Sequence, residues 1–261
     1  MLLCCALFCA VSGREVIRMA VRICPEGDRA LLVDFGNVID EKINQDVARL
    51  QRILEAQRIG GVEELVPTFR SLLVRYDPVR ISYQRLSSEV ETLLPGLSGK
   101  GESAEREIRT IHHIPCCYGG AFGEDLSSME KITGLSAGEI IRIHTGEEYR
   151  IYMLGFLPGF VYLGGLDRRI HAPRLMTPRT VIPAGSVGIG GAQTGVYPIA
   201  SPGGWRLIGR TPVKFYDPDR PSPILCRAGE YIRFEQVSEA EYAAIAVDVA
   251  RGTWQEEVTR R

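Results

Sequence analysis

The sequence lacks the short motifs by which metal ions, nucleotides and disulfide networks are usually recognised. It has no Cys-x-x-Cys pair and no His-Glu-x-x-His motif, so we expect no metal site. It has no Gly-x4-Gly-Lys-[Ser/Thr] loop, so the chain shows no phosphate-binding loop of this type. The seven cysteines are odd in number and irregularly spaced, and Cys116 and Cys117 are adjacent, which argues against a disulfide framework. These features favour a reducing, cytoplasmic setting.

An excess of charge of one sign is also lacking. The chain carries 31 basic and 32 acidic side chains, and its formal net charge is -1. This balance gives no electrostatic reason to expect nucleic acid or an anionic membrane surface as a partner. At 261 residues, with 45% hydrophobic and 24% charged content, the sequence has the composition of a globular protein with one large or two modest domains.

The first 18 residues are unlike the rest of the chain. Residues 1–13 are apolar but too short to span a bilayer, and no positively charged segment precedes them. A second methionine, Met19, is followed by a sequence that reads as the start of a folded domain. We interpret residues 1–18 as an extension from a mis-assigned start or a disordered tail, with a secretory signal as the alternative.

Residues 19–97 have the pattern of a small α+β sandwich domain. Ala30–Phe35 is an apolar strand candidate, and Asp40 precedes a helical pattern that ends at Gly60-Gly61. Two further strands are expected at 62–67 and 69–76. A second helix, from about Leu86 to Leu94, should end before the next proline. A strand, a helix, two strands and a helix in fewer than eighty residues are typical of an α+β fold.

The rest of the chain is built differently. Residues 98–105 are polar and glycine-containing, and we expect them to form a linker. In residues 106–240 short strands alternate with frequent glycines and prolines, and the helix starts at Asp125 and Ser136 are the exceptions. Such spacing favours a β-barrel or a sandwich with many tight turns. We expect residues 241–261 to be a C-terminal tail.

Chemical information is concentrated in three glycine-rich motifs between Met153 and Asp217. They are GFLPGFVYLGGL, TPRTVIPAGSVGIGGAQTGVYP and SPGGWRLIGRTP. They contain neutral hydrogen-bonding side chains and two arginines, whose guanidinium groups suit a carboxylate or phosphate. A small anionic or amide ligand fits this set, but no nucleophile–base pair is evident. The predicted substrate-binding residues are Arg179, Ser186, Gln193, Thr194, Tyr197, Arg210 and Thr211.

Other residues carry weaker signals, each with a structural explanation beside the functional one. His144 is a catalytic candidate, but a histidine at a helix C-terminus also suits the helix dipole. Glu124 is the second weak catalytic candidate, and Tyr118 shares its YGGAFGED turn. Phe160 and Trp205 are predicted, with Tyr118, to line a pocket or an interface, although buried aromatic residues are most often core. His112-His113 lie on a predicted strand, where one of the two must face outward.

These segments resemble the family of the B-type subunit of 5-oxoprolinase, also called allophanate hydrolase subunit 1 or the carboxyltransferase subdomain C and D family. The resemblance runs from about Val21 to Phe234 and includes PEGDRALLVDFG and IPCCYGGAFGEDL as well as the three glycine-rich motifs. It implies an N-terminal α+β domain followed by a cyclophilin-like β-barrel. The family also contains an inhibitor of a sporulation histidine kinase.

The resemblance implies a subunit of an ATP-dependent 5-oxoprolinase, which opens 5-oxo-L-proline to L-glutamate. The expected partners are a second carboxyltransferase-type subunit of the C type and a lactam-utilisation subunit of the A type. ATP would be consumed by the assembled complex. Two alternatives share the same motifs: a regulatory protein that inhibits a histidine kinase, and a carboxyltransferase subunit acting on allophanate or urea.

Overall fold

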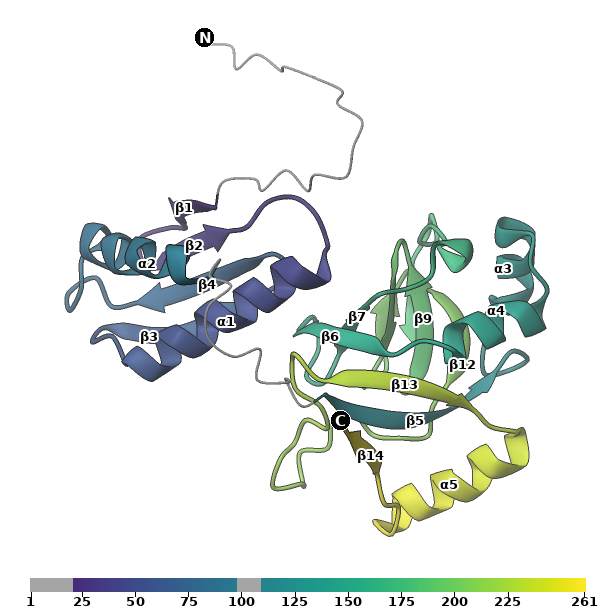
Figure 1. Ribbon diagram of the computed structural model, residues 1–261. Helices are drawn as coiled ribbons and strands as arrows, with labels where there is room; N and C mark the ends of the chain where they lie inside the picture. The colour runs from purple at the N-terminus through teal and green to yellow at the C-terminus, as the bar shows by residue number, and fades with distance from the viewer. Residues whose placement is uncertain (1–20, 98–108) are drawn as a thin grey trace.

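The computed structural model describes residues 21–97 and 109–261, so the predicted extension 1–18 and linker 98–105 lie outside the described residues. The described chain forms a small α+β unit followed by a larger β-rich unit (Figure 1). This arrangement confirms the predicted α+β fold class and its order.

The N-terminal unit is a four-stranded antiparallel sheet with two helices. Its strands are β1 (Arg22–Pro25), β2 (Ala30–Asp34), β3 (Val62–Pro67) and β4 (Ser71–Tyr76), in the spatial order β1-β2-β4-β3. Helices α1 (Glu41–Gln57) and α2 (Tyr83–Leu97) bury one apolar face each in a common core with the sheet. Asp40 caps α1 by accepting hydrogen bonds from two backbone amides of its first turn, as the sequence predicts.

Helix α2 is longer than predicted at both ends. Ser82 accepts from the amide of Arg85 and so starts the helix earlier. The helix also continues through Pro95 to Leu97. Proline lacks one backbone donor, and near the C-terminal end of a helix this removes a single hydrogen bond. Burial of Leu97 in the core cluster accompanies this last turn.

The larger unit is a closed barrel. Among the described residues, seven strands form the ring: β5 (Thr110–Tyr118), β12 (Arg206–Arg210), β9 (Ser186–Gly190), β10 (Gln193–Val196), β7 (Val161–Gly164), β6 (Tyr149–Leu154) and β13 (Tyr231–Gln236). Pairing of Gly209 with Tyr118 and of Arg210 with Cys117 closes it. The interior is filled by one apolar cluster, to which helices α3 (Leu126–Thr133) and α4 (Ala137–Thr145) contribute. Ser136 and Glu139 form the predicted capping box of α4.

Asp125 does not have its predicted role as a helix cap. It stands before α3 but makes no capping hydrogen bond. Its carboxylate instead accepts from the backbone amide of Leu207 at 2.7 Å and from Arg179 Nη2 at 2.8 Å. The acidic side chain therefore joins the YGGAFGED turn to the barrel wall.

The C-terminal segment is not the tail expected from the sequence. It contains helix α5 (Glu239–Arg251), capped by a Ser238–Glu241 box, and strand β14 (Glu257–Arg260). Strand β14 pairs antiparallel with residues 110–113 of β5, on the edge that β12 leaves free (Figure 1). An unpaired strand edge exposes backbone donors and acceptors, and β14 covers this one.

The two units meet at a polar contact. Asn44 of α1 donates to the carbonyl oxygen of Tyr152 at 3.1 Å, and Arg150 Nε donates to Asn44 Oδ1 at 3.1 Å. Phe69 packs edge-on against Tyr152 and Tyr162 beside these bonds. The contact places the start of α1 against β6 (Figure 1).

Gly123 is a position where the fold requires glycine. It is buried, and a Cβ atom there would overlap the backbone carbonyl of Ile208 on β12. We expect Gly123→Ala to lower the free energy of unfolding by about 2 kcal/mol or more, because neither backbone can give way. Gly138, exposed in α4 with open space around it, is the control, and Gly138→Ala should stabilise by about 0.5–1 kcal/mol. Chemical denaturation of both variants measures this, and equal stabilities would contradict the role given to Gly123.

Candidate functional site

The glycine-rich motifs form a two-layered wall on one side of the barrel. Val187 and Ile189 of β9 point into the barrel core. Because side chains alternate along a strand, Ser186, Gly188 and Gly190 face the opposite side. There a short ribbon of β8 (Arg179–Ile182) and β11 (Ser201–Gly203) covers them. Its Ile182 packs in a second apolar cluster with Phe160, Tyr197, Trp205 and Leu207.

Glycines in these strands make room for the Trp205 indole. A Cβ atom at Gly190 would lie 2.5 Å from Trp205 Nε1, and one at Gly195 would lie 3.0 Å from its Cζ3. Phe160 contacts the indole edge-on, with ring centroids 5.6 Å apart. Phe160 is 2% and Trp205 4% exposed, so these two side chains belong to the core of the chain. They are therefore not available to an interface, contrary to that part of the prediction, and form the inner side of the glycine-rich wall.

A buried hydrogen-bond relay lies on the barrel side of the same wall. Tyr118 Oη is 2.8 Å from His144 Nδ1, and His144 Nε2 is 2.9 Å from Thr194 Oγ1. Thr194 Oγ1 donates its proton to the carbonyl oxygen of Gly188. It must therefore accept from His144 Nε2–H, which leaves Nδ1 to accept from Tyr118. His144 is held as the neutral Nε2–H tautomer.

Burial explains why His144 stays neutral. Its side chain is fully inaccessible, and desolvation lowers its pKa to about 3. Its neighbours are the rings of Tyr118, Tyr149 and Phe234 and the Thr194 hydroxyl, none of which is an anion. The relay ends on a backbone carbonyl, so it orders β10 and α4 against each other. It contains no nucleophile–base pair.

Arg179 is already engaged by carboxylates of its own chain. It donates through Nη2 to Asp125, and its Nε lies 2.9 Å from Glu124 Oε1. Glu124, the other weak catalytic candidate, is exposed, and this ion pair ties it to Arg179. Arg210 is less constrained: its Nη2 donates to Ala121 O at 3.3 Å and its guanidinium lies over the Phe122 ring.

Most of the unpaired buried polar atoms come from the segment that contains the glycine-rich motifs. Within the described parts of the chain, six buried side-chain atoms have no hydrogen-bond partner, and five come from the segment 179–210. They are Arg179 Nη1, Ser186 Oγ, Gln193 Nε2, Ser201 Oγ and Arg210 Nε. Buried donors without partners are rare in folded proteins and carry a free-energy penalty of about 1–3 kcal/mol each. Hydroxyl, amide and guanidinium donors of this kind match an amide or anionic ligand.

The structure thus divides the sequence-predicted residues into groups. Ser186 and Arg210 are cross-strand partners, and Gln193 faces the same outer side of the wall. Thr194 faces the barrel with His144 and Tyr118. Thr211 is buried in a turn, where its Oγ1 accepts from the amide of Val213. Asp125 and Ser201 complete the outer group. The sequence did not indicate this role of Asp125, because its position before a helical pattern is that of a helix cap.

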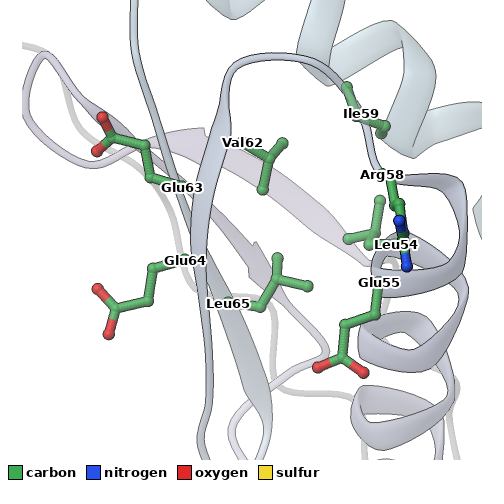
Figure 2. Close-up of a pocket in the computed structure, with 8 residues that line it drawn as sticks. All are labelled: Leu54, Glu55, Arg58, Ile59, Val62, Glu63, Glu64 and Leu65. Carbon is green, nitrogen blue, oxygen red and sulfur yellow. The ribbon is translucent and has the colours of Figure 1, made fainter.

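A pocket of about 360 Å³ lies elsewhere, in the N-terminal unit between the end of α1 and β3 (Figure 2). Val62 and Leu65 point from β3 toward α1, whereas Glu63 and Glu64 point to the other side. These glutamates form exposed ion pairs with Arg29 and Arg75. Surface ion pairs of this type contribute little to binding or stability, and none of the glycine-rich motifs reaches this pocket.

A barrel that follows a small α+β unit is the architecture of carboxyltransferase-type proteins with a cyclophilin-like barrel. The family described as carboxyltransferase domain, subdomain C and D, matches residues 21–226, and the chain belongs to this family. A relative from Bacillus subtilis, named as the B-type subunit of 5-oxoprolinase, is 45% identical over 84% of this chain and 93% of its own length. A protein of the same name from Escherichia coli O157:H7 is 51% identical over 80% of this chain and 92% of its own.

Solved structures agree with this fold. The crystal structure of TTHA0988 matches with a TM-score of 0.69 and 35% identity, covering 80% of this chain and 40% of that chain. The urea carboxylase of Kluyveromyces lactis matches with a TM-score of 0.76 over 92% of this chain and 24% of its own, at 21% identity. The latter likeness concerns the fold alone. No helix within the described residues is long and apolar enough to cross a membrane.

Because His144 is neutral in the folded chain, we expect the barrel to lose stability as the pH falls. With its folded pKa at about 3 and an unfolded value near 6.5, the unfolded chain binds a proton that the folded chain does not. Its stabilising contribution is therefore complete above pH 6.5 and declines as the pH falls toward 3. Between pH 7 and pH 5 the loss should be about 2 kcal/mol. In His144→Gln this part of the pH dependence should disappear, as measured by denaturation at each pH; parallel profiles would contradict the assignment.

Proposed function

We propose that this chain is the B-type subunit of an ATP-dependent 5-oxoprolinase, which opens 5-oxo-L-proline to L-glutamate. The observation that carries the proposal is the 45–51% identity, over nearly their full length, to relatives named as the B-type subunit of 5-oxoprolinase. The expected partners are a second carboxyltransferase-type subunit of the C type and a lactam-utilisation subunit of the A type. Both relatives are named as subunits, which supports an enzyme in which this chain acts together with other subunits.

The outer side of the glycine-rich wall supports a lactam as ligand. 5-Oxoproline presents a carboxylate, an amide N–H and an amide oxygen. Arg210, with a free Nε, suits the carboxylate, and its cross-strand partner Ser186 suits the amide, whereas Gln193 pairs with Gly190 at the other end of β9. Arg179 has one free nitrogen, Nη1, but Asp125 and Glu124 hold the rest of its guanidinium. We therefore assign anion binding to Arg210 first and a supporting role to Arg179.

Ring opening of a lactam benefits from coupling to ATP because the five-membered amide is stable. In our proposal the amide oxygen attacks the γ-phosphate and ADP leaves. Water then attacks the activated carbonyl carbon, and the ring nitrogen departs with a proton to leave an acyl phosphate. A second water hydrolyses this acyl phosphate to glutamate and phosphate. The role of this chain is to bind and orient the lactam. The phosphate-handling groups are assigned to the partner subunits, since this sequence contains no phosphate-binding loop of the common type.

Two alternatives rest on weaker grounds. A urea amidolyase from Lachancea kluyveri is 28% identical over 87% of this chain, which amounts to 14% of that protein. This match is more distant than those to the 5-oxoprolinase subunits, so a urea-derived substrate is the second choice. Histidine-kinase inhibition rests on the family resemblance alone. A lactam-utilisation gene beside this one would favour 5-oxoprolinase, a biotin carboxylase gene urea carboxylation, and a sporulation kinase gene the inhibitor.

The first test is subunit dependence. The purified chain alone should hydrolyse neither ATP nor 5-oxoproline, because its sequence has no phosphate-binding loop of the common type and its described residues present no nucleophile–base pair. Addition of the C-type and A-type subunits should give glutamate and ADP in equal amounts, measured by coupled assays. Turnover by the repurified chain alone would exclude the subunit role, and a reconstituted complex active only on urea-derived substrate would replace the lactam.

The second test concerns Arg210. Arg210→Lys in the complex should raise KM for 5-oxoproline about tenfold, because Lys cannot make the bidentate contact of a guanidinium group. Arg85→Lys, at an exposed ion pair with Glu89 on α2, is the matched control and should leave KM unchanged. Arg179→Lys should mainly lower the melting temperature, because it disturbs the bond to Asp125. An unchanged KM in a folded Arg210→Lys complex would remove Arg210 from substrate recognition.

A further inference from the structure

A cluster of ligand-type side chains lies away from the glycine-rich wall. His112, in the middle of β5, is paired across the sheet with Ile232 of β13 and Val258 of β14. Its side chain is on the same strand face as Ile114 and Cys116 and is 5% exposed. His113, next to it, points to the other face. Strands β5, β13 and β14 lie side by side near the C-terminus (Figure 1).

Three potential metal ligands meet at His112. A ring nitrogen of His112, the Sγ of Cys226 and a carboxylate oxygen of Glu256 all lie within 4.8 Å of one another. Cys226 is a free thiol and is 1% exposed, and Glu256 is half-buried. Imidazole, thiolate and carboxylate together are the donor set that zinc accepts. Cys226 belongs to the apolar core of the barrel, and its Sγ also reaches the His112–Glu256 contact, which distinguishes the cluster from an ordinary salt bridge.

Glu230 supplies the outer support that metal-binding histidines commonly have. Its Oε2 lies 2.8 Å from His112 Nε2 and also accepts from the amide of Arg227 at 2.7 Å. A carboxylate on one ring nitrogen fixes the orientation of the imidazole and leaves the other nitrogen for the metal. The nitrogen left here is Nδ1, which faces Glu256 at 2.5 Å.

We propose that His112 Nδ1, Cys226 and Glu256 bind a divalent transition-metal ion of the zinc type, with Glu230 orienting His112. On binding, Cys226 loses its thiol proton and Nδ1 loses the proton it shares with Glu256. The His112–Glu256 distance must widen to about 3.3 Å, as expected for two ligands of one zinc ion. Glu256 lies in the connection between α5 and β14, so the ion would fasten the C-terminal segment to the barrel.

Zinc titration of the full-length chain tests this site. After chelator treatment and dialysis, calorimetry should show one Zn²⁺ per chain, and Co²⁺ should give a thiolate-to-metal charge-transfer band. Cys226→Ser, which keeps the side-chain size, should abolish the band and weaken Zn²⁺ binding at least tenfold. Glu230→Gln should weaken it about 10–100-fold.

His113→Gln is the matched control. His113 is the neighbouring histidine and also contacts a carboxylate, Glu235, but among the described residues it belongs to no cluster of three possible metal ligands. This variant should bind Zn²⁺ like the parent, and Zn²⁺ should raise the melting temperature of both but not of Cys226→Ser. Absence of stoichiometric binding, or a cobalt band that survives in folded Cys226→Ser, would overturn the proposal and leave His112 as a bridge between two carboxylates.

Discussion

Closure of the barrel between β12 and β5 is the constraint on which the glycine-rich wall depends. Only two residue pairs join these strands, and they are reinforced from outside the ladder. Asp125 accepts the Leu207 amide and Arg179, while the amides of Gly119 and Asp125 donate to the carbonyls of Ile208 and Leu207. One turn therefore holds β12 in place and restrains Arg179 of the covering ribbon. Through β12, it also fixes the neighbours of Ser186 on β9.

The glycines of this wall are required for a reason other than the one that their frequency suggests. A dense glycine pattern is usually read as turns or as close approach to a ligand. Here Gly188, Gly190 and Gly195 lie within paired strands and provide the flat surface on which the Trp205 ring is packed. Burial of the indole brings the ribbon of β8 and β11 down onto the barrel. Several polar atoms of these strands, among them Ser186 Oγ and Ser201 Oγ, are buried without a hydrogen-bond partner.

Local sequence signals predicted much of the fold but little of the site. The Asp40 cap and the Ser136–Glu139 box depend on residues three apart, so they could be read directly. Asp125 was misread because its true partners, Leu207 and Arg179, are more than fifty residues away. Strand β14 was missed for a similar reason: its exposed, charged sequence pairs with an edge of β5 that only barrel closure creates. The His112 cluster joins residues 144 positions apart, beyond any motif.

The contact between the two units depends on directional hydrogen bonds. A buried apolar interface would tolerate small rotations, whereas hydrogen bonds are directional and short. Asn44 uses both its amide groups, and Arg150 extends the contact to Tyr231, whose hydroxyl donates to Glu41 on α1. Tyr231 begins β13, and β13 is the neighbour of β5. The N-terminal unit is thus tied to β6 and β13 of the ring and, through the contact of Phe69 with Tyr162, to β7.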